Sequence, residues 1–207
     1  MRPGRRLAVT GAALMLALAG CDSTGDARPA TAPSYNFRDS GFDACRQPTG
    51  PVPTERALPA VTLPCMDGSG GELALAKAPG VPTVVTLWGS WCAPCGKELP
   101  AFEALHHAAR GRVAVLGVNT EDSGTNAVAA ARELGVTFPS VYDRAGKVRR
   151  GLGRNALPVT VFVAADGQVV DVYNAAPLDA STLRALVRKY LGVAVAVTPS
   201  PSVGAGR

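Results

Sequence analysis

The 207 residues suffice for one domain with extensions, and at 47% hydrophobic content they can bury a substantial core. The formal net charge is +5, but without Arg2, Arg5 and Arg6 the 21 basic residues fall to 18, against 16 acidic residues. This near balance excludes the basic surface that nucleic-acid binding would need.

Residues 1–20 have the features of a signal peptide. Three arginines precede the apolar run Leu7–Ala19, which is too short for a conventional transmembrane helix. The run ends in Leu18-Ala19-Gly20-Cys21, which resembles the lipobox of bacterial lipoproteins. By that resemblance Cys21 receives a diacylglycerol thioether and becomes the first residue of a protein held at the membrane by its acyl chains. Ordinary secretion with a chance cysteine is the alternative.

Residues 21–56 are rich in Ser, Thr, Ala, Pro and Gly and show no apolar period, which indicates a flexible tether. Tyr35, Phe37 and Phe42 are candidates to dock on the domain that follows, and Cys45 could pin this end of the chain. We place that domain at 57–192.

Two short apolar runs in Leu58–Leu75 flank Asp67–Gly71, a pattern typical of a β-hairpin, and Cys65 lies at its turn. A disulfide between Cys45 and Cys65 would close a loop of about 20 residues and contribute ~3 kcal/mol. Disulfides persist in the oxidising compartment to which a signal peptide directs a protein. The alternative is that one of the two cysteines takes part in thiol exchange.

The next stretch, Val84–Pro100, places a pair of cysteines between a strand and a helix. We predict a strand at Thr83–Leu87 and a helix from Pro94 to about Arg110. The open N-terminus of a helix favours negative charge, so Cys92 should have a lowered pKa and attack disulfides as a thiolate. Cys95, one turn further on, can reach back to Cys92.

Three other uses of these cysteines have to be considered. The first is a buried disulfide that serves only to stabilise the fold. A zinc site needs four ligands, and the chain has no second Cys-x-x-Cys, while His106 and His107 lie some 17 Å along the same helix. Peroxiredoxin chemistry would need threonine where Gly89 stands.

The remaining pattern alternates strands and helices, which predicts right-handed crossovers on a parallel sheet, followed by an antiparallel strand pair around the turn at 165–168. No internal repeat stands out. The predicted elements are a strand at Val113–Val118, a helix at Asn126–Leu134, a loop and short strand at Thr137–Asp143, a brief helix at Lys147–Leu152, strands at Val159–Val163 and Val169–Tyr173, a helix around Leu183–Leu191, and a disordered tail at 193–207.

The motif Trp91-Cys92-Ala93-Pro94-Cys95 after a buried strand resembles the active site of the thioredoxin superfamily. Pro100 and Leu157-Pro158 match the helix-kinking proline and the cis-proline of that superfamily, and the pattern CxPCxKExP resembles its TlpA/ResA-like branch. Over residues 57–192, the resemblance implies an α/β thioredoxin fold, a central mixed sheet flanked by helices, with an N-terminal β-hairpin extension.

The resemblance also implies roles for single residues. Cys92 would be the nucleophile and Cys95 the resolving cysteine, and Glu98 would tune the thiols and accept protons. Alternatively, Glu98 merely complements the helix dipole. Thioredoxin has a buried aspartate where this chain has Thr86, which makes Glu98 the nearest proton acceptor.

Substrate contacts follow from the same resemblance. A cis Pro158 would leave the backbone of Leu157 free to pair with an extended substrate strand. Trp91 is expected to flank the reactive sulfur, and Ala93 and Pro94 between the cysteines complete the contact surface. Trp88 is expected to pack in the core instead.

These features predict a lipid-anchored enzyme on the extracytoplasmic face of the cell membrane. Proteins of the TlpA/ResA-like branch are thiol-disulfide oxidoreductases, many of them in cytochrome c maturation. The expected partners are protein disulfides or dithiols and a membrane electron donor, with no metal or other cofactor. The alternatives are an oxidase that forms disulfides in exported proteins and a module whose dithiol binds Cu(I).

Overall fold

The computed structural model describes residues 36–196. The predicted signal peptide, Cys21, the first part of the predicted tether and residues 197–207 lie outside the described residues. Among the helices within 36–196, none has both the length and the apolar character needed to cross a membrane.

A five-stranded mixed sheet forms the centre of the domain, in the order β5-β4-β3-β6-β7. β3 is parallel to β4 and β4 to β5, whereas β6 is antiparallel to both β3 and β7. A separate antiparallel hairpin, β1 and β2, precedes the sheet. The strands are β1 (Thr62–Pro64), β2 (Glu72–Ala74), β3 (Thr83–Trp88), β4 (Ala114–Thr120), β5 (Ser140–Asp143), β6 (Val159–Val163) and β7 (Val169–Tyr173).

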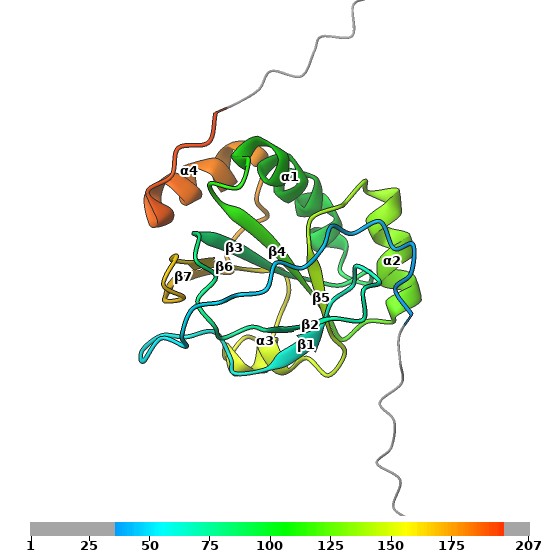
Figure 1. The fold of residues 1–207 in the computed structure, drawn as a ribbon. Helices are drawn as coiled ribbons and strands as arrows, with labels where there is room; N and C mark the ends of the chain where they lie inside the picture. Colours follow the sequence, from blue (N-terminus) through cyan, green and yellow to red (C-terminus); the bar gives the residue numbers. More distant parts are fainter. Residues whose placement is uncertain (1–35, 197–207) are drawn as a thin grey trace, which may run out of the picture. The chain divides into compact units, whose positions relative to one another are not determined.

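Helices cover one face of this sheet, and the β1–β2 hairpin with the short α3 lies against the other (Figure 1). This arrangement confirms the expected thioredoxin-like class with an N-terminal hairpin. Cys65 lies directly after β1, where its backbone forms an isolated antiparallel β-bridge with that of Val141. The helices are α1 (Ala93–Ala109), α2 (Gly124–Glu133), α3 (Lys147–Gly151) and α4 (Ala180–Leu191).

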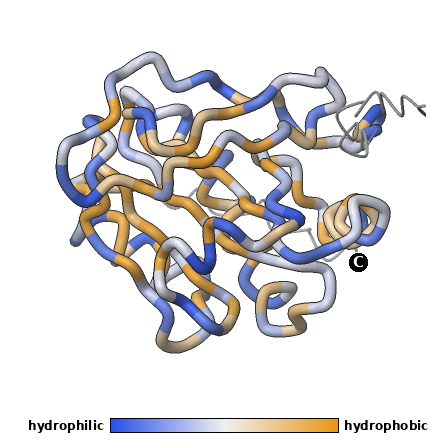
Figure 2. The backbone as a smooth tube through the Cα atoms, turned by 90° about the horizontal axis from the view of Figure 1, so that it is seen from below, coloured by the Kyte–Doolittle hydropathy of each residue, from blue (hydrophilic) through white to orange (hydrophobic). Residues whose placement is uncertain are grey.

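The apolar strands divide their side chains between two cores because successive residues of a strand point to opposite faces. In β3, Val84 and Trp88 join the core beneath the helices, whereas Val85 and Leu87 join the core beneath the hairpin. The near-continuous apolar sequence of this strand follows from burial on both faces. Figure 2 shows the hydrophobic segments running through the interior, with the hydrophilic ones mostly at its margin.

Residues 36–56 are packed on the domain, although their composition suggested a tether. Phe37 is 5% exposed and Phe42 is 7% exposed, and their rings lie 5.4 Å from that of Tyr142 and 6.4 Å from that of Trp88 respectively, measured between centroids. The predicted docking of these two aromatic residues is therefore seen. The tether prediction is wrong for 36–56, because aromatic burial outweighs the polar composition of the segment.

The start of the predicted disordered tail also contacts the domain. Val193 and Val195 pack against the core beneath the helices, and Arg112 Nη1 donates a hydrogen bond of 2.8 Å to the carbonyl oxygen of Ala194. The boundary of the domain therefore extends at least to residue 196.

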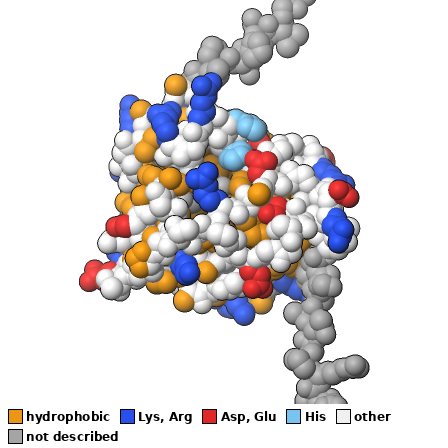
Figure 3. Space-filling view, in the orientation of Figure 1, with side chains coloured by type: hydrophobic (Ala, Val, Ile, Leu, Met, Phe, Trp, Pro, Cys, Tyr) orange, Lys and Arg blue, Asp and Glu red, His pale blue; other side chains and the backbone are white. Residues whose placement is uncertain are grey.

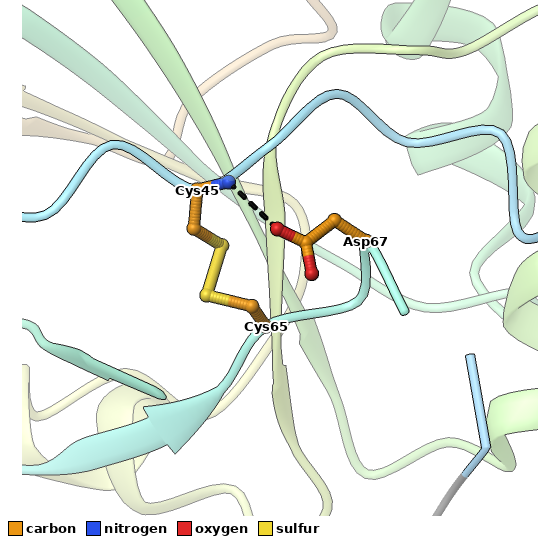
Figure 4. A group of neighbouring side chains, drawn as sticks. All are labelled: Cys45, Cys65 and Asp67. Atoms are coloured by element: carbon orange, nitrogen blue, oxygen red, sulfur yellow. Dashed lines mark hydrogen bonds between the residues drawn. A yellow bond between two sulfur atoms is a disulfide. The ribbon is translucent and has the colours of Figure 1, made fainter. Parts of the chain in front are cut away.

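Residues 43–50, which we call the strap, cross the sheet in front of β4 (Figure 1) and are fixed at several points. Cys45 forms a disulfide with Cys65, with 6.1 Å between the Cα atoms, and its N–H donates to Asp67 Oδ2 at 3.0 Å (Figure 4). Because the two sulfur atoms are bonded to each other, neither is a thiolate that could bind a metal ion beside Asp67. The structural pairing expected for these cysteines is confirmed.

Removing this disulfide with Cys45→Ser and Cys65→Ser together is expected to lower the free energy of unfolding by about 3 kcal/mol, since the bond closes a loop of about 20 residues. Urea unfolding in a background lacking Cys92 and Cys95 measures the effect without a second disulfide. Dithiothreitol should lower the stability of the parent in that background by the same amount. An unchanged midpoint would show that the strap is held by packing alone.

Candidate active site

The turn between β3 and α1 presents the two cysteines at the N-terminus of α1. Cys92 is the residue that caps the helix, and Cys95 lies in its first turn. They form a disulfide with 5.3 Å between their Cα atoms, and the N–H of Cys95 donates to Cys92 Sγ at 3.2 Å. When the disulfide is reduced, this N–H and the helix dipole favour the thiolate form of Cys92.

The two sulfur-bearing residues differ in their access to solvent. Cys95 is 1% exposed and Cys92 is 5% exposed in the disulfide form. The side chains around Cys92 are much more open: Trp91 is 56% exposed, and Ala93 and Pro94 are also exposed. Both cysteines are therefore largely buried in the disulfide form, and the exposed surface beside them is formed by Trp91, Ala93 and Pro94.

Asp122, which follows β4, fixes the turn that precedes Cys92. Its carboxylate accepts hydrogen bonds from the N–H of Ser90 at 2.6 Å, from Ser90 Oγ at 2.7 Å and from Asn119 Nδ2 at 2.9 Å. Tyr142 Oη in turn donates to the backbone carbonyl of Asp122 at 2.6 Å. No motif in the sequence points to Asp122. Its available signal was a polar residue at the carboxyl end of a parallel strand, where sites of α/β proteins gather.

Trp91 is oriented by the loop that contains Asp122. Its indole N–H donates to the carbonyl oxygen of Glu121 at 3.0 Å, and Glu121 adopts a left-handed φ of 52°. A Cβ atom on Gly89 would lie 2.7 Å from Trp91 Nε1, so the indole occupies the space that a side chain there would need. The threonine of a peroxiredoxin would clash at this position.

Replacing Asp122 with alanine is expected to lower the free energy of unfolding by roughly 2–4 kcal/mol, because four donors, including the N–H of Ser123, lose their acceptor and Asn119 is fully buried. We also expect slower thiol exchange, since the turn before Cys92 is released. Asp166→Ala is the control, because Asp166 accepts a backbone N–H in an exposed turn far along the chain. Equal decreases in the midpoint temperature of thermal unfolding for the two variants would contradict the role of Asp122.

Glu98 lies one turn beyond Cys95 on α1, so both face the same side of the helix. It is 2% exposed, and Oε1 accepts the N–H of Leu178 at 2.7 Å, while Oε2 is buried without a partner among the described residues. Burial raises the pKa of Glu98 from 4.5 to about 7, although the hydrogen bond from Leu178 works in the opposite direction. The carboxyl group can therefore gain or lose a proton near neutral pH.

A cavity of about 290 Å³ connects Glu98 with the residues expected to meet substrate. Pro94, Leu157 and Pro158 line it together with Tyr173. The Leu157–Pro158 peptide bond is cis, as expected, and Asn174 Nδ2 donates to the carbonyl oxygen of Pro158. Three segments far apart in sequence thus line one cavity beside the dithiol.

The other residues singled out in the sequence take mostly structural positions. Trp88 is fully buried, as expected, and Thr86 is 1% exposed. Pro100 lies inside α1. The two histidines occupy the far half of α1, where His106 Nε2 lies 2.9 Å from Asp43 Oδ2 and His107 Nε2 lies 2.8 Å from Glu103 Oε1.

Comparison with known proteins agrees with this geometry. The family model described as Redoxin matches residues 53–187, well over half of the chain. The chain belongs to the Redoxin family. That match begins shortly before the hairpin and ends in α4, so it includes the dithiol and the cis-proline.

Among named relatives, the thiol-disulfide oxidoreductase ResA of Geobacillus thermodenitrificans is 33% identical over 104 residues, which are 50% of this chain and 60% of ResA. The thiol:disulfide interchange protein DsbE of Xylella fastidiosa is 31% identical over 115 residues, 55% of this chain and 57% of DsbE. The chain thus spans about three fifths of the length of these relatives.

Solved structures show the same fold at lower identity. A secreted Mycobacterium tuberculosis disulfide oxidoreductase, described as homologous to E. coli DsbE, is 23% identical with a TM-score of 0.56, covering 63% of this chain and 96% of its own. DsbF of M. tuberculosis is 22% identical with a TM-score of 0.58, and the match covers 69% of this chain and 99% of DsbF. The thioredoxin-like fold is therefore shared.

Proposed function

We propose that the protein is a thiol-disulfide oxidoreductase of the ResA/DsbE type, anchored outside the cytoplasm, that reduces a disulfide in an exported protein. The observation that carries the proposal is the Cys92–Cys95 pair at the open end of α1, next to the exposed Trp91. The similarity to proteins named ResA and DsbE supports the same chemistry. Reduction of apocytochrome c during its maturation is the substrate role that we propose first.

The reaction proceeds in two exchange steps. The thiolate of Cys92 attacks one sulfur of the partner's disulfide, so that a mixed disulfide forms and the other partner sulfur leaves as a thiolate that takes up a proton. The Cys95 thiol then loses its proton and attacks Cys92 Sγ, which releases the second partner thiol and leaves the Cys92–Cys95 disulfide. Two electrons and two protons pass to the partner, and a membrane dithiol donor restores the reduced enzyme.

Glu98 is the group that we propose to receive the proton of Cys95. It is buried, lies one helical turn away and has a pKa near 7, so that its ionised form is available at neutral pH. Leu157 and Pro158, beside the same cavity, are proposed to hold an extended segment of the partner against Trp91, Ala93 and Pro94.

A redox titration of Cys92 and Cys95 in the mature chain tests the direction of transfer. A reductase should have a potential close to the value of about −270 mV known for thioredoxin, and an oxidase one closer to about −120 mV, as in DsbA. A value at the oxidising end would overturn the reductase proposal in favour of the disulfide-forming oxidase. Tight Cu(I) binding by a dithiol that exchanges with no protein would favour the metal-binding module.

Membrane attachment is proposed to depend on Cys21. Cys21→Ser is expected to move the protein from the membrane fraction to the soluble extracytoplasmic fraction and to abolish incorporation of labelled fatty acid, because the thioether can no longer form. Cys45→Ser, in the same expression system, should leave attachment unchanged. Membrane association of Cys21→Ser equal to that of the parent would contradict the lipid anchor.

A further inference from the structure

A second cavity, of about 270 Å³, lies beneath the strap at the other end of the sheet from the dithiol. Thr83 and Val85 of β3 line it, whereas Cys92 follows the opposite end of that strand, roughly 17 Å further along at the rise of a strand. No step of the proposed exchange reaction uses this cavity.

The cavity arises from the shortness of β5. β5 pairs with β4 only from Gly117 to Thr120, so Ala114–Leu116 have no strand beside them on that edge. The strap crosses this gap instead, with Ala44 and Pro48 facing the cavity. These small side chains line the space without filling it.

The walls of the cavity are aliphatic, and they belong to the buried core beneath the hairpin. Leu58, Leu73, Leu75, Val85 and Val163 line it, each of them 5% exposed or less. Apart from His106 near Asp43, no aromatic ring is among the lining residues, so the walls suit a flexible alkyl chain better than a flat aromatic ligand. An apolar cavity of about 150 Å³ holds benzene, so this one has room for a chain of about eight to ten carbons.

The mouth of the cavity carries positive charge that has no partner. Arg46 and Lys77 both line it, and both are exposed. Within residues 36–196, neither side chain takes part in a hydrogen bond or an ion pair. Asp43 also lines the mouth, but it is already held by His106 at 2.9 Å. Figure 3 shows hydrophobic side chains gathered on this face below the two histidines, with Lys and Arg side chains among them.

We propose that this cavity is a binding site for a small amphipathic anion, namely an unbranched alkyl carboxylate of about eight to ten carbons. Its chain lies between Leu73, Leu75 and Val163, and its carboxylate pairs with Arg46 and Lys77. The disulfide of Cys45 holds Arg46 at the mouth, because the two residues are adjacent. The protein therefore has a ligand site that is separate from its dithiol.

Calorimetric titration of the mature chain with decanoate and with decanol, each below the concentration at which it aggregates, tests the proposal. Decanoate is expected to bind one to one and at least tenfold more tightly than decanol. The double substitution Arg46→Glu and Lys77→Glu should lower the affinity for decanoate at least tenfold and leave the affinity for decanol unchanged. Arg184→Glu with Arg188→Glu on α4, which changes the charge equally, should alter neither affinity.

Two further measurements locate the ligand. Ala114→Phe, at a half-buried lining position, should fill the cavity and abolish binding of both compounds while thermal unfolding remains cooperative. In NMR spectra of the parent protein, decanoate should show contacts to the methyl groups of Leu73, Leu75 and Val163. This measurement does not depend on the folding of Ala114→Phe. Absence of one-to-one binding, equal binding of decanoate by the Arg46/Lys77 variant and the parent, or contacts to Leu157 beside the dithiol would each overturn the proposal.

Discussion

Replacing Cys92 with serine will abolish thiol-disulfide exchange, with a loss of at least about 10³-fold, whereas replacing Cys95 will stop the reaction at a mixed disulfide. The reason is the asymmetry of the pair: the exposed Trp91 lies beside Cys92, and Cys95 is 1% exposed. A serine hydroxyl at position 92 cannot serve as the nucleophile. At position 95 it cannot release the partner once Cys92 has attacked.

The measurement is reduction of a cystine-containing test protein, followed by non-reducing gel electrophoresis after alkylation. Cys95→Ser should give a band that contains both proteins and disappears with dithiothreitol. Cys45→Ser with Cys65→Ser is the matched control and should retain exchange within about twofold, because that disulfide joins the strap to the end of β1. Trapping of the partner on Cys45 or Cys65 would refute the assignment of Cys92.

Replacing Glu98 with glutamine is expected to change the pH dependence of the second exchange step. In the parent, the rate should rise with pH around 7, where Glu98 becomes able to accept the Cys95 proton. In Glu98→Gln the rise should move above pH 8, towards the titration of the thiol itself, and the rate at pH 7 should fall by about 10²-fold. Rapid mixing of the preformed mixed disulfide at several pH values measures this step directly.

The same substitution should stabilise the protein in alkaline solution. The unfolded chain releases the Glu98 proton near its ordinary pKa of 4.5, whereas the folded protein holds it to about 7, so the stability of the parent falls as pH rises between these values. Above pH 7 the ionised Glu98 lowers the free energy of unfolding by its full amount, at most about 3 kcal/mol. Glu98→Gln keeps an oxygen for the N–H of Leu178 and should lack this fall.

Glu133→Gln serves as the control, because Glu133 is an exposed carboxylate at the end of α2. It should leave both the exchange rate and the pH dependence of urea unfolding unchanged. If Glu98→Gln retains the parent's rate profile while losing only the fall in stability, Glu98 is a buried group of the core and not the proton acceptor.

The order and type of most elements could be predicted from the sequence because they depend on local patterns. β6 and β7 have the predicted bounds, since the Asp-Gly turn between them and their β-branched residues specify a hairpin locally. The tether prediction is wrong for 36–56 because the two buried aromatic residues of this segment are few among polar ones. Whether Phe37 and Phe42 are buried depends on Tyr142 and Trp88, which lie far along the chain.

By itself, the sequence determined the residues of the candidate site: two cysteines one helical turn apart, delivered by an apolar strand to the start of a helix, with a proline before a later strand. These are properties of spacing and residue type. Only the tertiary structure decided which groups surround the dithiol and where the domain has a second cavity. Asp122 fixes Ser90 across 32 residues of sequence, and the shortness of β5 opens the cavity between the strap and the sheet. Such features depend on distances between segments, which no local pattern of residues encodes.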